Sequence, residues 1–108
     1  MDSVRKFSQD RDWDQFHSPK NLAMAMSVEV AEVVELFQWL TQEESKRLSK
    51  SKKQMLEEEL ADVYIYLLKL AAHYNINLIN AARKKLTKNA LKYPAPKARG
   101  NAKKYTEL

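Results

Sequence analysis

The sequence predicts an all-α fold, a bundle of four main helices, and three observations support it. Apolar residues recur every three to four positions over long stretches of the 108-residue chain, which is the period of an amphipathic helix. There are only one glycine and three prolines, whereas an all-β fold needs many tight turns. The length suits one domain, which we expect over residues 1–94, with a basic tail over residues 95–108.

The first half of the chain carries start signals for helices. We expect a first helix over residues 3–12. Ser18 is a typical N-cap, and Pro19 suits the first helical position, so a second helix should run over residues 19–40. Residues 41–44 read Thr-x-x-Glu, the spacing of a capping box, which predicts a short helical turn.

The second half predicts two further helices. Residues 45–54 are rich in serine and lysine and suggest a mobile loop. We expect Ser51 to cap a third helix ending near Tyr74, and Asn77 to cap a fourth that Pro94 terminates. Within the third, "DVYIYLLKLAA" is apolar nearly all round, which a small chain buries best by forming a homo-oligomer.

Composition excludes several classes of protein. Without cysteine there is no disulfide and no thiolate metal site. No apolar run reaches about 18 residues, and "MDSVRKFSQD" lacks the apolar core of a signal peptide. We therefore expect a cytoplasmic protein with no membrane partner.

Charge is distributed unevenly along the chain. Residues 1–82 carry 10 Lys and Arg against 13 Asp and Glu, whereas residues 83–108 carry 9 against one. A basic end beside acidic helices indicates a polyanionic partner, either a phosphate-rich small molecule or a nucleic acid.

Two acidic pairs lie on or beside apolar helix faces. At about 100° per residue, Glu29 falls inside the stripe of the second helix and Glu32 at its edge. On the third helix Glu59 falls inside the stripe and Asp62 beside it. The two stripes are formed by Leu22, Met26, Val33, Leu36 and Leu40, and by Met55, Val63, Tyr66 and Leu70.

These four acids require a counter-charge. A lone Glu-x-x-Glu usually marks a solvated face, but here the spacing occurs twice within apolar stripes. Buried carboxylates that repel one another must be protonated, paired or metal-bound, and neither stripe contains a Lys or Arg. Oxygen ligands without Cys or nearby His favour Mg²⁺ or Mn²⁺ over Zn²⁺. Di-metal carboxylate bundles use Glu-x-x-His, which is absent because neither His17 nor His73 follows a Glu by three residues.

Four ordered segments resemble a known family. "RDWDQFHSPKNLA", "EVAEVVELFQW", "EEELADVYIYLLKLAA" and "KNALKYP" resemble the MazG-like all-α nucleoside triphosphate pyrophosphohydrolases, and within them the dCTP pyrophosphatase branch, as does "KKYTEL". The resemblance implies a Mg²⁺-dependent enzyme, with Mn²⁺ as a substitute, that cleaves a nucleoside triphosphate between the α- and β-phosphates. It also implies a dimer or, as we favour, a tetramer.

The resemblance also implies roles for individual residues. The family's metal acids match Glu29, Glu32, Glu59 and Asp62. Glu32 and Glu35 are the candidate catalytic acids. The phosphate-contacting positions match Lys85, Asn89 and Tyr93. The candidates for base or sugar binding are Trp13, His17, Trp39 and Tyr66.

Two alternatives remain open from the residues alone. The inward acids would also suit a non-catalytic helical assembly that binds a structural ion. The basic residues 83–108 would suit nucleic-acid binding, although no recognition motif occurs among them.

Overall fold

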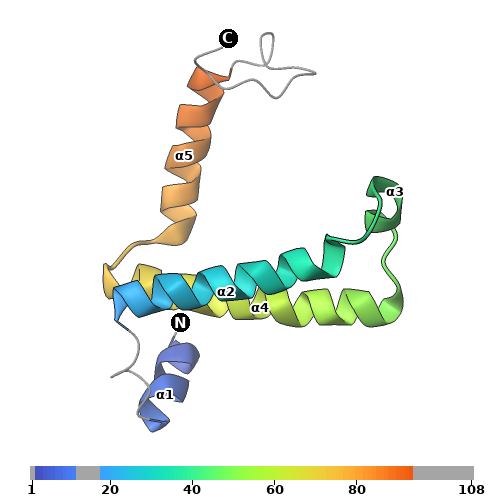
Figure 1. Cartoon of the computed structure of the whole chain (residues 1–108). Coiled ribbons are helices and arrows are strands. Elements are labelled where there is room, and N and C mark those ends of the chain that lie inside the picture. Colours follow the sequence, from blue (N-terminus) through green and yellow to red (C-terminus); the bar gives the residue numbers. More distant parts are fainter. Residues whose placement is uncertain (1, 12–17, 94–108) are drawn as a thin grey trace. The chain divides into compact units, whose positions relative to one another are not determined.

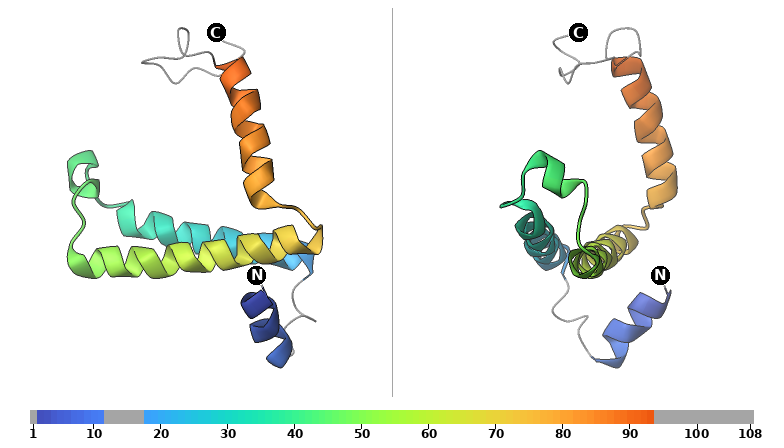
Figure 2. Two further views of the ribbon diagram at one scale, coloured as in Figure 1. Left: turned by 180° about the vertical axis from the view of Figure 1, so that it is seen from behind. Right: turned by 90° about the vertical axis from the view of Figure 1, so that its right-hand side faces the viewer.

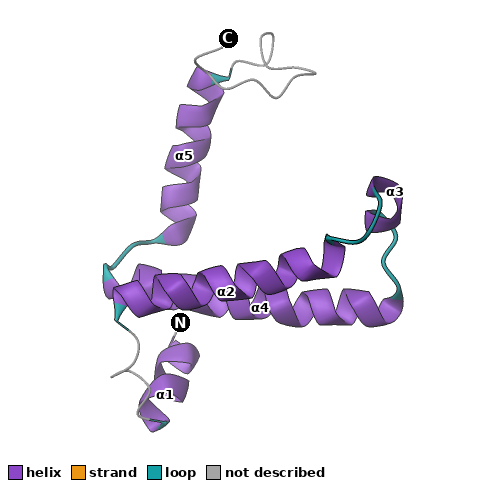
Figure 3. Cartoon of the chain, viewed as in Figure 1, coloured by secondary structure: helices purple, strands orange, loops and turns teal. Residues whose placement is uncertain are grey.

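The computed structural model describes residues 2–11 and 18–93, and every regular element in these ranges is a helix (Figures 1 and 3). The all-α class with four main helices and one short turn is therefore confirmed. The predicted boundary at residue 94 and the basic tail lie outside the described residues. The elements are α1 (Asp2–Asp10), α2 (Pro19–Phe37), α3 (Gln42–Ser45), α4 (Lys50–His73) and α5 (Leu78–Lys92).

The chain divides into two compact units, residues 1–75 and residues 76–108, which are treated separately below. The first unit contains α1 to α4, and the second contains α5. None of the described helices combines the length and the apolar character needed to cross a membrane.

Three of the predicted helix starts are confirmed by their hydrogen bonds. The Ser18 side chain caps α2, with Pro19 following it. Thr41 and Glu44 form the predicted capping box: the Thr41 N–H donates to Glu44 Oε1 at 2.9 Å and the Glu44 N–H donates to Thr41 Oγ1 at 3.1 Å. Asn77 caps α5. Each cap satisfies a backbone N–H that has no partner within its own helix.

The predicted start of α4 is wrong by two residues. Ser49, not Ser51, is the N-cap, and its Oγ accepts a hydrogen bond from the Lys52 N–H at 3.2 Å. The loop predicted over residues 45–54 is accordingly reduced to the four residues between α3 and α4. Either serine can act as an N-cap, so the local sequence does not distinguish them. With Ser49 as the cap, Leu48 and Lys52 are both half-buried.

The first unit is built on α2 and α4, which run antiparallel and lie side by side in all views (Figures 1 and 2). Leu22 of α2 and Ala71 of α4 are buried, at 3% and 6% exposure. The faces that the two helices turn toward each other form the seam. Its half-buried members are Met26, Glu29, Glu32, Val33, Leu36 and Leu40 on one side, and Lys52, Leu56, Glu59, Val63, Tyr66 and Leu70 on the other.

Apolar side chains also cover the outer faces of these two helices. Met55, predicted within the stripe of α4, is half exposed because it lies on the rim of the seam. Val30 and Val34 on α2, and Leu60 and Tyr64 on α4, are exposed as well. One pair of helices cannot cover faces that are apolar nearly all round, so much apolar surface of the chain remains open to solvent.

Candidate metal centre

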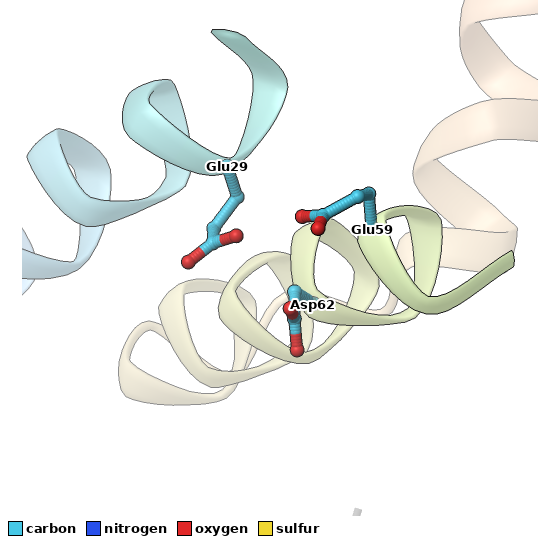
Figure 4. Close-up of side chains that lie close together, drawn as sticks. All are labelled: Glu29, Glu59 and Asp62. Atoms are coloured by element: carbon cyan, nitrogen blue, oxygen red, sulfur yellow. The ribbon is translucent and has the colours of Figure 1, made fainter. Parts of the chain in front are cut away.

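Three carboxylates converge at the middle of the seam. One oxygen from each of Glu29, Glu59 and Asp62 lies within 4.8 Å of the others. Glu29 reaches out from α2, and Glu59 and Asp62 come from successive turns of α4 (Figure 4). This convergence follows from the sequence, because residues three apart share one helix face and the two acid-bearing faces pack together.

Glu29 and Glu59 are the more deeply placed of the three. Both side chains are half-buried, whereas Asp62 is exposed. The Oε2 atoms of Glu29 and Glu59 are shielded from solvent and have no hydrogen-bond partner among the described residues. An ionised carboxylate only accepts hydrogen bonds, so a neighbouring acid cannot satisfy it unless one of the two is protonated.

The pKa values of these acids reflect this crowding. A hydrogen bond to Glu32 is the largest cause that raises the pKa of Glu59 to about 7, followed by desolvation and the charges of the neighbouring acids. The pKa of Glu29 is also raised, first by burial and then by Glu32, while a hydrogen bond with Glu59 acts the other way. Without a cation, the crowding of these acids therefore favours the protonated form of Glu59.

The donor set fits a hard divalent cation. All the converging ligand atoms are carboxylate oxygens, the ligands that Mg²⁺, Mn²⁺ and Ca²⁺ prefer. Two of these carboxylates have an oxygen that is shielded and unpaired, which is the state that a bound cation would relieve.

Glu32 joins the same cluster, as its effect on the pKa values of Glu29 and Glu59 shows. It is not among the three acids whose oxygens converge. Glu35 lies one turn further along α2 and is exposed. Of the predicted acids, the structure thus brings together Glu29, Glu32, Glu59 and Asp62, and leaves Glu35 at the edge.

The predicted base- and sugar-binding residues differ in position. Trp39 lies just after α2 and is 87% exposed, an unusual state for so large an apolar side chain. Tyr66 is half-buried on the seam, one turn beyond Asp62. Trp13 and His17 lie outside the described residues.

The predicted phosphate-binding residues belong to the second unit, where Lys85 and Asn89 share one face of α5 and Tyr93 is its C-cap. Lys85 is exposed, and Asn89 and Tyr93 are half-buried. The Tyr93 N–H donates to the Asn89 carbonyl oxygen at 2.8 Å, which closes the end of the helix. Their contact with phosphate remains a prediction.

One residue of the seam was missed by the sequence reasoning. Lys52 is half-buried on the face of α4 that carries Glu59, so the expectation that no Lys or Arg lies on the acid-bearing faces is wrong. The stripe of α4 was counted only from Met55 onward. Seven residues separate Lys52 from Glu59, which corresponds to about two helical turns and returns to the same face.

Comparisons with known proteins identify relatives that match over most of the chain. The chain is 46% identical over 105 residues to dCTP pyrophosphatase 1 of Homo sapiens, and 43% identical over 105 residues to that of Rattus norvegicus. Each alignment covers 95% of this chain. The chain spans 62% of the length of these relatives.

A solved structure and a family model extend the likeness. The crystal structure of a pyrophosphatase from Archaeoglobus fulgidus matches with a TM-score of 0.81 and 46% identity, over 86% of this chain and 87% of the other. The model of the MazG-like family matches residues 24–108, which include all four clustered acids. The chain belongs to the MazG-like family.

Proposed function

We propose that this protein is a Mg²⁺-dependent nucleoside triphosphate pyrophosphohydrolase. Its substrate would be a deoxynucleoside triphosphate, dCTP or a close relative, and its products the monophosphate and pyrophosphate. The observation that carries the proposal is the convergence of Glu29, Glu59 and Asp62, with two shielded and unpaired oxygens among them. The relatives named dCTP pyrophosphatase 1 support the reaction class. We place this activity in the balancing or cleaning of cytoplasmic nucleotide pools.

The acids of the seam would have different roles in hydrolysis. A Mg²⁺ ion, or Mn²⁺ in its place, would supply positive charge that screens the triphosphate and polarises its phosphorus–oxygen bonds. The oxygen of a water molecule joins the α-phosphorus as the bond to the α–β bridging oxygen breaks. Glu32, at the edge of the cluster, takes the proton of this water, and Glu35 one turn away orients it. Pyrophosphate then leaves.

The remaining residues would bind the substrate. Lys85 and Asn89 of α5, with Tyr93 at its C-cap, would contact the phosphates, because an ammonium and an amide both donate hydrogen bonds to phosphate oxygens. We assign base and sugar binding to Trp13, His17, Trp39 and Tyr66. A tryptophan exposed as fully as Trp39 presents a free aromatic face, and stacking on a base contributes roughly 1–3 kcal/mol.

We further propose that the enzyme acts as a homo-oligomer, most simply a tetramer. Support comes from the exposed apolar faces of α2 and α4. The catalytic domain would extend over residues 1–94, with the basic residues 95–108 as an appended tail.

The test is a product analysis with purified protein and each of the eight common nucleoside and deoxynucleoside triphosphates in the presence of Mg²⁺. We expect monophosphate and pyrophosphate in equal amounts, with loss of both on addition of EDTA. Orthophosphate and a diphosphate as products would contradict cleavage between the α- and β-phosphates.

The same experiment separates the two competing functions. A structural ion predicts that Mg²⁺ raises the melting temperature while no triphosphate is hydrolysed. Nucleic-acid binding by α5 and the tail predicts steeply salt-dependent binding to DNA or RNA with no turnover.

A further inference from the structure

Two lysines of α4 differ from every other lysine that the structure describes. Lys52 and Lys69 are half-buried, whereas the remaining described lysines are exposed. Lys52 precedes Glu59 by seven residues, and Lys69 follows Asp62 by seven. Seven residues make about two helical turns, so each lysine returns to the side of α4 that carries its acid, about 10 Å away along the helix axis. These two are therefore the candidate cations for a ligand bound at the acids.

The direction of helical side chains distinguishes between the two lysines. The Cα–Cβ bonds of an α-helix tilt toward its N-terminus, and a long side chain covers the turn that precedes its own residue. The stem of Lys52 therefore leads away from Glu59, toward a cavity at the start of α4 that none of the clustered acids lines. The stem of Lys69 leads back toward Asp62, and its four carbons span much of the separation between them. Of the two, Lys69 is thus the one that can share a ligand with the acids.

Lys69 also lies on the side where the acid cluster opens to solvent. Asp62 is exposed, whereas Glu29 and Glu59 are half-buried, so a ligand reaches the cluster past Asp62. Seven residues fall only about 20° short of two full turns, so Lys69 and Asp62 border the same edge of α4. Tyr66, which is half-buried between them in the sequence, lies nearer to α2. The edge from Asp62 to Lys69 is therefore a path along which a bound substrate can extend.

Charge complementarity favours a cation at this edge. The cluster presents carboxylates, and a triphosphate adds several negative charges, so one divalent ion does not neutralise both. The other lysines of α2 and α4 that the structure describes, Lys20, Lys50 and Lys53, are exposed and lie in the first turn of their helices, away from the acids. Lys69 is therefore the lysine of this helix pair that suits a phosphate beside the cluster.

We propose that Lys69 binds the pyrophosphate end of the substrate, which is the part that leaves. This inference rests on the proposed function and adds a substrate-binding residue to it. With the α-phosphorus at the acid cluster, the β- and γ-phosphates extend along the edge of α4 toward Lys69.

Lys69 acts on the charge that develops during cleavage. As the oxygen of water joins the α-phosphorus, the bond from this phosphorus to the α–β bridging oxygen breaks, and its electron pair stays on the pyrophosphate. The Lys69 ammonium donates hydrogen bonds to the phosphate oxygens that share this charge and keeps its own protons. Its contribution is therefore specific to the pyrophosphate and does not extend to the monophosphate product.

The test measures inhibition by each product separately, using inorganic pyrophosphate and dCMP with Mg²⁺, for the full chain and for Lys69→Met, which keeps a long side chain and removes the charge. We expect the inhibition constant for pyrophosphate to rise about tenfold, or about 1.4 kcal/mol, and that for dCMP to stay unchanged. A lysine that only covers the apolar edge of α4 would affect both constants or neither.

Two further variants control this experiment. Lys69→Arg keeps a cation that binds phosphate and should retain most of the affinity for pyrophosphate. Lys53→Met removes an exposed lysine from the first turn of the same helix and should behave as the wild type. Circular dichroism checks that the helices persist, and Lys69→Gln, which also removes the charge, replaces Lys69→Met if that variant does not fold.

An unchanged inhibition constant for pyrophosphate in Lys69→Met, or equal losses for pyrophosphate and dCMP, would overturn the inference while leaving the proposed hydrolysis intact. If the wild type hydrolyses no triphosphate, the proposed function fails. Calorimetric titration with pyrophosphate and Mg²⁺ then decides the inference separately. Binding to the wild type that Lys69→Met weakens about tenfold supports it, whereas equal affinities, or no binding to the wild type, contradict it.

Discussion

Among the described residues, the acid cluster contains no cationic side chain that would neutralise Glu59, so a proton or a bound cation is favoured there. The pKa of Glu59, about 7, lies well above the ordinary value of 4.5. Below pH 4.5 the group is protonated in both the folded and the unfolded chain, so its contribution to stability is fully present and does not change with pH. Between 4.5 and 7 the unfolded chain loses its proton first, and the metal-free fold becomes less stable as pH rises.

This titration predicts a pH-dependent response to Mg²⁺. A cation and a proton compete for the same carboxylate, so Mg²⁺ should raise the melting temperature at pH 8 and have little effect at pH 5. In EDTA, the contribution of Glu59 should make the fold more stable at pH 5 than at pH 8. Thermal unfolding followed by circular dichroism at the two pH values measures both effects.

The control for this prediction is Glu59→Gln, which keeps the shape of the side chain but neither titrates nor ligates as a carboxylate. This variant should reduce the pH dependence of the melting temperature in EDTA and weaken the rise in melting temperature that Mg²⁺ causes at pH 8. The matched variant Glu58→Gln changes the exposed neighbour and should retain both responses. A Mg²⁺ response as large at pH 5 as at pH 8 would contradict the assignment of the ion to this cluster.

For individual residues, the sequence best predicted the features that depend only on the local geometry of a helix. Helical periodicity alone singled out Glu29, Glu32, Glu59 and Asp62, because the direction of a side chain on a regular helix depends only on its position in the chain. The same periodicity places Lys52 on this face two turns before Glu59, but the stripe was counted only from Met55 onward. Which helix packs against that face is a tertiary property that periodicity does not give.

Among the elements, α4 supplies two of the three converging acids, and its first turn is fixed by one side chain. Ser49 Oγ accepts the Lys52 N–H, whereas Ser51, two residues on, lies inside the helix. Local sequence could not decide between the two serines, although it correctly identified the caps of α2, α3 and α5. The site itself is insensitive to this error, since the acids lie two turns or more further along.

We therefore predict that Ser49→Ala lowers the stability of the protein by about 1 kcal/mol, the usual cost of losing an N-cap. Ser51→Ala should cost much less, because the Ser51 hydroxyl contacts only Ser49 Oγ and caps no backbone N–H, and alanine is the better helix former. Chemical denaturation of both variants in the same buffer measures the difference. Equal losses in the two variants, or a larger loss in Ser51→Ala, would show that the helix starts where the sequence alone suggested.

For the whole molecule, the open question is what covers its apolar surface. Val30, Val34, Leu60 and Tyr64 are between 44% and 58% exposed on the two helices that form the seam. Fully burying one such side chain contributes roughly 1.5–3 kcal/mol, so their joint burial would offset much of the entropy lost on association. The sequence predicted that the second half of α4 is apolar nearly all round. It could not predict which surface covers these side chains, because contacts with a partner produce no periodic pattern in the chain.

We predict that the chain of 12.6 kDa forms a homo-oligomer in solution and that Tyr64→Asp shifts it toward the monomer. A carboxylate at the centre of an apolar interface would be buried without a partner, which costs several kcal/mol. Light scattering coupled to size-exclusion chromatography gives the mass of each species, and circular dichroism checks that the helices persist. Gln54→Asp is the control, because it adds the same charge at an exposed polar position of the same helix and should leave the mass unchanged. A wild-type mass near 12.6 kDa would rule out the oligomer, and an unchanged larger mass in Tyr64→Asp would place the interface on another face of the molecule.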